Sequence, residues 1–466
     1  MSIGFRGRLV ASSLAIALQA VVTVVHPAGA TGRPEAVAVR PVLLPQYPVG
    51  LAVDPGNGHL VTVNTASAPV PYARYRFSSF SLIDLRAGHL LRTVPLTRTV
   101  FFTREVFNLA PQHTLAVDTR RGRLYVPVQS ADANKPGAVL GFDDRTGALA
   151  SVWPVGLNPQ HVAVAPLEGH VVVSDLGGFG SMGVPGDVRI FDTRTGRAIR
   201  TVGPGAVLGH DGNPELVAVD EARGQTWVVN VRYGHLPTIA FVILSTISGK
   251  AQMSLPLPRS SGYTNIQSLA LDTRRGHLWA GGYDIAGSFA MVALFDARSH
   301  RLLNGISPSP AATEPITSGN VDTSVVVDAR TGAAFAATAF LRPSLSGPPA
   351  VTMLSAQTGR AVRTTFLNVR GYAAGYTAGC NISGAAIDSR KASLYVPLEC
   401  TAYGGGNARS FLAVLDIRRG VLRRLVPLGR GRPGIAVDTA SGRVYAYAFG
   451  SKTLTIVCAA GAVTRC

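Results

Sequence analysis

The stretch LAVDTRRGRLYV, residues 115–126, decides the fold of this 466-residue chain, because copies of it recur along the sequence. One copy reads LALDTRRGHLWA at residues 269–280, and six others follow the same plan of apolar run, aspartate, polar turn and second apolar run. The aspartate, or its replacement, recurs every 47 to 64 residues, at Asp54, Asp118, Ala165, Asp220, Asp272, Asp328, Asp388 and Asp438. Such self-similarity is typical of a repeat architecture.

Each copy predicts a β-hairpin. The aspartate carboxylate can accept hydrogen bonds from backbone N–H groups two residues on, and the glycine that closes most copies supplies a positive φ. A second half with the same plan follows each copy, as in AVLGFDDRTGALASVWPV from Ala138 and DVRIFDTRTGRAIRTV from Asp187. Two hairpins give four antiparallel strands per unit, so the sequence predicts an all-β fold, a β-propeller.

The two ends of the chain indicate how the ring closes. The last unit provides three strands, GIAVD, VYAYAF and TLTIVCA, and then only GAVTRC remains. Residues Ala36–Leu44 match a fourth strand that has no first three before it. We expect this N-terminal strand to complete the last of eight four-stranded blades. Seven blades is the alternative, if the first unit, with its long gap, is not a separate blade.

The first thirty residues have the layout of a secretory signal peptide. Arg6 and Arg8 precede the apolar run Leu9–Val25, and small residues surround Ala30, after which we expect cleavage. An uncleaved anchor is the alternative, because 17 apolar residues approach the length that spans a bilayer. We therefore predict a signal peptide at residues 1–30, a single propeller domain at 31–466, and export to the periplasm or the extracellular space. No membrane association is expected after cleavage.

All four cysteines, Cys380, Cys400, Cys458 and Cys466, lie near the C-terminus. An even number in an exported protein predicts disulfides, and we favour the local pairs Cys380–Cys400 and Cys458–Cys466 among the three possible connectivities. No C-x-x-C motif is present, which argues against a structural zinc site or a redox dithiol. We expect no cofactor.

The formal charge is +18, or +16 once Arg6 and Arg8 are removed, and arginine supplies nearly all of it. Such a charge could attract nucleic acid or another anionic polymer. The arginines are scattered singly and in pairs, however, with no basic run of five or more. A solvated basic surface is the favoured interpretation, and nucleic-acid or anionic-polymer binding is kept as an alternative.

The chain resembles the YVTN-type β-propeller repeat family. The resemblance rests on the AVD…G-x-LYV pattern, on FDTRTG-like turns and on the joint VGLNPQHVAV, residues 155–164, and it covers most of the mature chain. It implies an exported, ring-shaped bacterial protein but no particular activity, since members bind varied partners. Related propellers include lactone-cleaving and streptogramin-cleaving enzymes.

Candidate functional residues lie five to seven positions before each aspartate, where the copies stop agreeing. Propeller ligands commonly bind at the channel mouth, on connections that enter the innermost strand. The candidate ligand-binding residues there are His113, Asn158, Gln160, His161, His210, Asp211, Asn213, Glu215, Asn265 and Gln267. The same residues would also suit turn capping and contact with water.

The favoured function is a non-enzymatic scaffold that binds an unknown protein or small-molecule ligand, as a monomer. A lactonase-like or lyase-like enzyme that uses histidine and glutamate at the channel mouth is the alternative. The sequence contains no G-x-S-x-G, H-E-x-x-H, P-loop or EF-hand motif, and we assign no catalytic residue and no metal ligand. The histidines that follow turn glycines, among them His59 and His170, are expected to be exposed turn residues, as is His300, which replaces a turn glycine.

Overall fold

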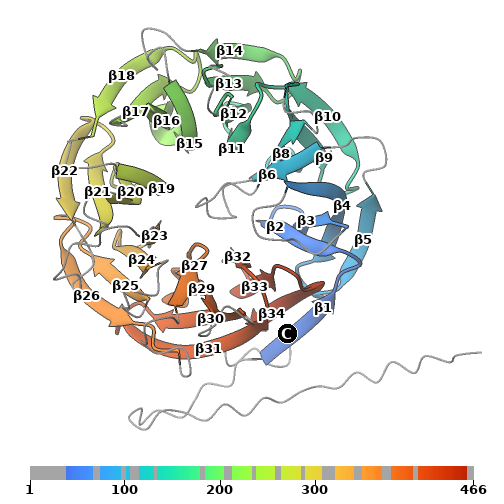
Figure 1. Cartoon of the computed structure of the whole chain (residues 1–466), viewed down its shortest axis with the longest axis vertical. Helices are drawn as coiled ribbons and strands as arrows, with labels where there is room; N and C mark the ends of the chain where they lie inside the picture. Colours follow the sequence, from blue (N-terminus) through green and yellow to red (C-terminus); the bar gives the residue numbers. More distant parts are fainter. Residues whose placement is uncertain are drawn as a thin grey trace, which may run out of the picture.

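The computed structural model describes residues 38–66, 74–95, 101–104, 115–130, 134–178, 184–203, 212–232, 238–257, 264–284, 289–306, 321–340, 349–369, 379–401 and 408–458. Their strands form eight four-stranded antiparallel blades around a central axis, as Figure 1 shows, which confirms the predicted β-propeller and excludes the seven-bladed alternative. The described residues include one short 3₁₀ helix, η3 (Glu221–Arg223), and no helix long and apolar enough to cross a membrane.

We letter the strands of each blade a to d from the axis outward. Blade 1 comprises β2 (Tyr47–Asp54), β3 (His59–Thr65), β4 (Arg74–Asp84) and β5 (Leu90–Pro95). Blade 2 comprises β7 (Ala116–Asp118), β8 (Arg123–Ser130), β9 (Ala138–Asp143) and β10 (Leu149–Pro154). Blade 3 comprises β11 (Pro159–Ala165), β12 (His170–Asp175), β13 (Asp187–Asp192) and β14 (Ala198–Val202). Blade 4 comprises β15 (Gly212–Asp220), β16 (Gln225–Arg232), β17 (Thr238–Ser245) and β18 (Ala251–Pro256).

The second half of the ring follows the same plan. Blade 5 comprises β19 (Thr264–Asp272), β20 (His277–Asp284), β21 (Phe289–Asp296) and β22 (Arg301–Ile306). Blade 6 comprises β23 (Val321–Val327), β24 (Ala334–Phe340), β25 (Ala350–Leu354) and β26 (Ala361–Phe366). In blade 7 strand a is divided into β27 (Gly379–Ile382) and β28 (Ala386–Asp388), followed by β29 (Ser393–Thr401), β30 (Arg409–Asp416) and β31 (Val421–Gly429).

The N-terminal strand closes the ring. Blade 8 consists of β32 (Pro433–Asp438), β33 (Arg443–Ala448) and β34 (Thr453–Cys458), and β1 (Ala38–Leu43) adds its strand d by pairing antiparallel with β34. This confirms the closure expected from the sequence. The long first gap is explained by one more strand, β6 (Phe101–Arg104), which pairs with both β4 and β8 and so joins blades 1 and 2.

The repeated aspartate forms the predicted turn. Asp118 is fully buried, and its Oδ1 accepts the backbone N–H groups of Arg120 and Arg121 at 3.1 and 3.2 Å. The turn glycines have positive φ, as at Gly122 (59°), and His300 and Ala392 adopt the same conformation where glycine is replaced. The turn chemistry predicted from the sequence is therefore present at these turns.

Apolar side chains of strands b, c and d pack one blade against the next. The rings of Tyr125 and Trp153 in blade 2 stack with centroids 5.2 Å apart, and Trp153 stacks in turn on Phe191 of blade 3 at 5.3 Å. The Cys380–Cys400 disulfide joins the directly paired strands β27 and β29 and confirms the first predicted pair. Cys466 lies outside the described residues, so its pairing with Cys458 stays a prediction.

Candidate functional site

The antiparallel order gives the propeller two distinct ends. The a–b and c–d turns lie at one end, which we call the turn end, and the b–c and d–a connections lie at the other, the loop end. The predicted site residues precede or begin strand a and belong to the loop end. The predicted residues His113, His210 and Asp211 lie outside the described residues.

A β-bulge in strand a occurs at the position five before the aspartate in four described blades. The register with strand b skips one residue of strand a in each of these blades, namely Val49, Gln160, Glu215 and Gln267. A bulge re-aims a side chain and interrupts an edge strand, and bulges are common beside functional sites. The polarity noticed in the sequence thus coincides with a backbone irregularity, while strand a of blade 6 pairs regularly.

In blade 3 the bulged Gln160 belongs to a buried polar group. Its Nε2 donates to Asn158 Oδ1 at 2.5 Å, and both side chains are buried. The carboxylate of Asp175, at the end of β12, accepts the backbone N–H groups of Asn158 and Gly177 at 3.0 and 2.8 Å. Burial raises the pKa of Asp175 to about 7, although these N–H groups act in the opposite direction. Asp175 therefore joins the b–c and d–a connections of this blade.

The predicted His161 and Glu215 serve the contact between blades 3 and 4. His161 Nδ1 accepts the backbone N–H of Val217 at 3.3 Å, and the carbonyl of Glu215 accepts the Ser174 hydroxyl at 2.7 Å. Since Nδ1 accepts this hydrogen bond, a proton on the neutral ring is assigned to Nε2. These contacts give His161 a structural role that its sequence position did not reveal.

Blades 5 and 6 repeat this contact with more hydroxyl groups. Gln267 Oε1 accepts the Thr323 N–H at 2.7 Å, and Ser268 Oγ accepts the Val325 N–H at 2.9 Å and donates to the Thr323 carbonyl at 3.2 Å. A Cβ on Gly281 would lie 2.6 Å from Val325 Cγ2, so this glycine permits the close approach of β23. We call Gln267, Ser268, Thr323 and Ser324 the blade 5–6 junction.

Several polar atoms of these residues have no hydrogen-bond partner among the described residues. At the blade 5–6 junction they are Gln267 Nε2, Thr323 Oγ1 and Ser324 Oγ, and in blade 3 the atom is Gln160 Oε1. All four side chains are at most 4% exposed. The remaining predicted residues are half-buried: Asn213 donates to the Val231 carbonyl at 3.2 Å, and Asn265 to the Tyr283 hydroxyl at 3.4 Å. Within the described ranges, no three His, Cys, Asp or Glu side chains are grouped as a metal site.

At the turn end, the arginine three residues after the aspartate contacts the next blade. Arg121 Nη1 donates to Asp118 Oδ2 at 3.0 Å and to the Pro166 carbonyl of blade 3 at 2.9 Å. Arg223 repeats this with Asp220 and with the Thr273 carbonyl of blade 5. The interpretation of the arginines as merely solvated is wrong for these residues, because a one-dimensional repeat does not show which carbonyl of the next unit lies within reach.

Blade 3 has Ala165 in place of the aspartate, and a neighbour replaces the missing carboxylate. Glu221 Oε1, from blade 4, accepts the Leu167 N–H at 2.6 Å, the N–H that the aspartate accepts in other blades. Burial raises the pKa of Glu221. The turn hydrogen bond is thus kept, but in blade 3 its acceptor comes from the next blade instead of from the same turn.

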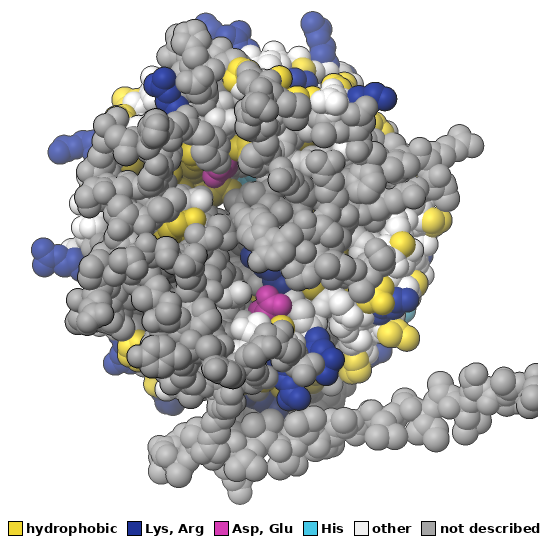
Figure 2. Space-filling view, in the orientation of Figure 1, with side chains coloured by type: hydrophobic (Ala, Val, Ile, Leu, Met, Phe, Trp, Pro, Cys, Tyr) yellow, Lys and Arg dark blue, Asp and Glu magenta, His cyan; other side chains and the backbone are white. Residues whose placement is uncertain are grey.

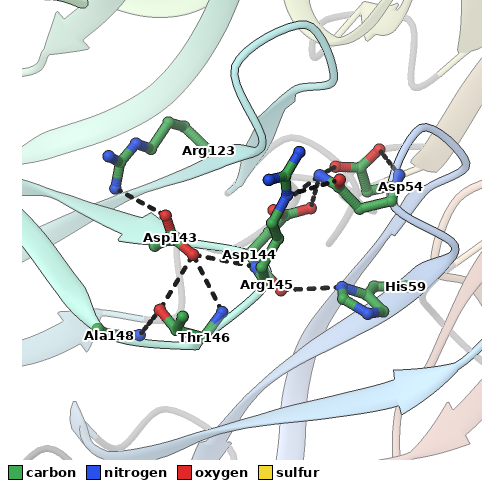
Figure 3. Close-up of polar contacts among 9 residues, drawn as sticks. Asp54, His59, Arg123, Asp143, Asp144, Arg145, Thr146 and Ala148 are labelled. Atoms are coloured by element: carbon green, nitrogen blue, oxygen red, sulfur yellow. Dashed lines mark hydrogen bonds and ion pairs between the residues drawn. The ribbon is translucent and has the colours of Figure 1, made fainter.

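Blades 1 and 2 meet through two carboxyl groups, which Figure 3 shows. Asn57 Nδ2 donates to Asp54 Oδ2 at 3.2 Å and to both oxygens of Asp144 at 2.9 Å, and the Asp144 carbonyl lies 2.9 Å from His59 Nδ1. Burial, and next the neighbouring Asp54 carboxyl, raise the pKa of Asp144 to about 7. Asp144 is an extra aspartate beside the expected Asp143, and the sequence analysis overlooked it.

The turn histidines are also less exposed than predicted. His59 and His170 are half-buried, and each Nδ1 lies within hydrogen-bond distance of a carbonyl in the next blade, 2.9 Å from that of Asp144 and 3.0 Å from that of Thr246. His300 is half-buried too, with its ring edge-on to Trp227 at a centroid distance of 5.7 Å. Strand b brings these rings against the neighbouring turn, which the sequence position alone does not reveal.

Charge is unevenly distributed over the face in Figure 2. Lysine and arginine side chains project around its circumference, and further basic side chains lie beside an acidic patch nearer the centre.

Comparison with known proteins supports the fold and nothing finer. No family model matches the sequence, and no curated protein matches it. Among solved structures, the chain is similar to the Dos1 propeller (TM-score 0.57, 10% identity, 91% of this chain and 94% of that one). It is similar to Sqt1 of Saccharomyces cerevisiae (TM-score 0.56, 10% identity, 91% and 98%) and to the dihydro-heme d1 dehydrogenase NirN in complex with DHE (TM-score 0.54, 11% identity, 89% and 71%).

Sequence reasoning found the bulged positions but missed their partners. Ser268, Thr323 and Ser324 follow or match the position of Gln267 and look like ordinary strand residues. The paired glycines Gly281 and Gly282 in WAGGYD were the available signal, because glycine in a strand marks a close backbone approach.

Proposed function

We propose that this β-propeller is an exported, non-enzymatic scaffold that binds an uncharged, hydrogen-bonding ligand at its loop end, with the blade 5–6 junction as the principal contact. Uncharged oligosaccharides and peptide main chains belong to this ligand class, since both offer donors and acceptors without charge. Within this proposal, the β-propeller fold is the part that the structure shows.

The three unpartnered polar atoms of the blade 5–6 junction carry the proposal. Gln267 Nε2, Thr323 Oγ1 and Ser324 Oγ are buried, and a buried polar group without a partner costs about 1–3 kcal/mol. The orientation of the Gln267 amide is fixed, because its Oε1 accepts the Thr323 N–H. A ligand that hydrogen-bonds these groups would recover that free energy, and their neutrality defines its chemistry.

The hydrogen bonding of His161, the predicted general base, favours binding over catalysis. His161 Nδ1 is occupied by the Val217 N–H, so its use for proton abstraction would break the contact between blades 3 and 4. Export is supported by the Cys380–Cys400 disulfide, since such bonds persist in oxidising compartments.

The test is a thermal-shift screen of the mature chain against uncharged oligosaccharides and neutral peptides, followed by calorimetric titration of each ligand found. Thr323→Val and Ser324→Ala should each weaken binding about tenfold, because each removes one hydroxyl that has no partner among the described residues. Ser248→Ala at the turn end is the matched control and should bind as the wild type does. If both loop-end variants bind every ligand unchanged, the proposed site is wrong.

A further inference from the structure

The turn end carries a second surface, unrelated to the proposed ligand site. In nine of the described turns an exposed arginine stands two residues after the turn aspartate. In the inner, a–b turns these are Arg120, Arg274, Arg330 and Arg390, and in the outer, c–d turns they are Arg86, Arg145, Arg194, Arg298 and Arg418. Because both kinds of turn lie at one end, the fold arranges these arginines in two concentric rings.

The turns hold the backbone of these arginines and leave their side chains exposed. In every one of these turns except that of Arg274, the arginine N–H donates to the turn aspartate, as for Arg194 to Asp192 Oδ1 at 3.0 Å and Arg330 to Asp328 Oδ1 at 3.1 Å. Arg145 differs in its side chain, because its Nε also donates to Asn57 Oδ1 of blade 1 at 3.1 Å. The carboxylates accept these N–H groups beneath the turns. The pKa of Asp192 is lowered first by the Thr195 N–H, and that of Asp328 is lowered, against burial, first by hydrogen bonds from the Ser389 and Thr331 side chains. Guanidinium groups are therefore the charges that extend furthest from this end.

Two turns in neighbouring blades replace the arginine with a large aliphatic residue. Leu167, in the a–b turn of blade 3, is 55% exposed, and Ile247, in the c–d turn of blade 4, is 62% exposed. The two turns adjoin, since His170 Nδ1 lies 3.0 Å from the Thr246 carbonyl. Exposed aliphatic side chains among arginines are unfavourable in water. In a bilayer interface, the arginines can contact lipid headgroups while the aliphatic side chains contact the acyl chains.

We propose that the turn end of the propeller docks onto an anionic lipid bilayer, with the two arginine rings on lipid phosphates and with Leu167 and Ile247 in the interface. Guanidinium binds phosphate through several donors and is weakly hydrated, which suits it to this role. A ring of charges on the end of a disc matches a flat surface, whereas a linear polyanion would need a continuous track. From the sequence we expected no membrane association after signal cleavage. The scattered arginines form one surface only after the blades close, so the sequence does not reveal it.

The experiment measures co-sedimentation of the mature chain with vesicles of phosphatidylcholine alone and of phosphatidylcholine mixed with phosphatidylglycerol. We expect binding to the mixed vesicles only, weakened by salt. The inner-ring variant Arg120→Gln/Arg274→Gln/Arg330→Gln/Arg390→Gln should lower the partition coefficient at least about tenfold. The matched control Arg200→Gln/Arg409→Gln/Arg424→Gln/Arg430→Gln removes the same charge from strand d and the loop end and should bind nearly as well as the wild type.

Insertion is tested by fluorescence. An Ile247→Trp variant should show a blue-shifted emission on mixed vesicles, whereas Val362→Trp, on the outer strand of blade 6, should not.

Equal losses of vesicle binding in the two arginine variants would overturn the proposal, because binding would then follow net charge alone. So would absent vesicle binding, or binding of soluble dextran sulfate through the inner ring without a shift at Ile247→Trp, since the partner would then be a polymer. Failure here leaves the loop-end ligand unaffected, because Thr323 and Ser324 lie at the other end.

Discussion

The turn end and the loop end of this propeller lie at opposite ends of strand a, and they differ in how closely their residues repeat from blade to blade. At the turn end, a buried aspartate ends or directly follows strand a in seven of the eight blades, and residues such as Arg121 and Arg223 hydrogen-bond to the next blade. At the loop end, the strand begins with a bulge whose residue differs between blades: Val49, Gln160, Glu215 and Gln267. The repeated end holds the ring together, and the varied end is available for recognition.

This difference arises because the turn residues contact residues of the next blade, whereas the varied loop-end hydroxyls do not depend on such contacts. Arg223 lies against Gly276 of the next blade, where a Cβ would come 2.4 Å from its Nη2, so the aspartate, arginine and glycine of successive units depend on one another. The hydroxyls of Thr323 and Ser324, by contrast, have no partner among the described residues and can change without breaking a blade contact.

The largest expected effect is on the buried turn aspartate. Asp118→Ala should lower the free energy of unfolding by about 3 kcal/mol, because it removes a fully buried carboxylate that accepts two turn N–H groups and the Arg121 guanidinium. Asp143→Ala, in the c–d turn of the same blade, is the control and should cost about 1 kcal/mol because that side chain is 30% exposed. Equal losses in urea unfolding would mean that burial does not distinguish the two turns.

A smaller loss is expected at the glycine that faces an arginine. Gly276→Ala combines a φ of +75° with displacement of Arg223 and should cost about 2 kcal/mol. Gly58→Ala has a similar φ, +71°, with open space around it, and should cost about 1 kcal/mol. If thermal unfolding shows the same loss for both, the arginine contact contributes nothing.

The carboxyl pair between blades 1 and 2 predicts a dependence on pH. Because the pKa of Asp144 is raised to about 7, the native state holds a proton that the unfolded state loses above about pH 4, so stability falls as pH rises from 4 to 7. Asp144→Asn should remove this loss and be more stable than the wild type by about 1 kcal/mol at pH 8, after allowance for solvent screening.

A matched control for this pH dependence has the opposite sign. Turn N–H groups, first that of Thr195, lower the pKa of Asp192, so its contribution is present above the ordinary carboxyl pKa and is lost as pH falls. Asp192→Asn should therefore lose stability at pH 8. Urea unfolding at pH 5 and pH 8 measures both variants, and a wild-type advantage over Asp144→Asn that grows with pH would contradict the first prediction.

The smallest effect on stability is expected at the loop end. Ser324→Ala removes a buried hydroxyl that has no partner in the part of the chain that the structure describes, so the free energy of unfolding should stay within about 0.5 kcal/mol of the wild type, or rise. A loss above about 2 kcal/mol in urea unfolding would show that this hydroxyl is structural. The two ends would then differ less than the comparison implies.

The fold was predictable because its signals are local and repeated. Asp118 and Gly122 specify a turn within five residues, and the incomplete last unit together with Ala36–Leu44 predicted the closure that β1 and β34 make. The candidate site was predictable only by position. Gln160 and Gln267 stood out as polar residues in apolar strands, but the sequence does not give the register shift that makes them bulges.

The sequence by itself determined the turns and the alternation of buried residues, and it favoured eight blades and the Cys380–Cys400 pairing, since each depends on residues close together or on the count of repeats. Only the tertiary structure decided which residues of different blades meet. It set Arg121 against the Pro166 carbonyl, Gln267 against Thr323, and Asp144 beside Asp54. It also gathered scattered arginines onto one end, because closing a ring brings every copy of a turn to the same face.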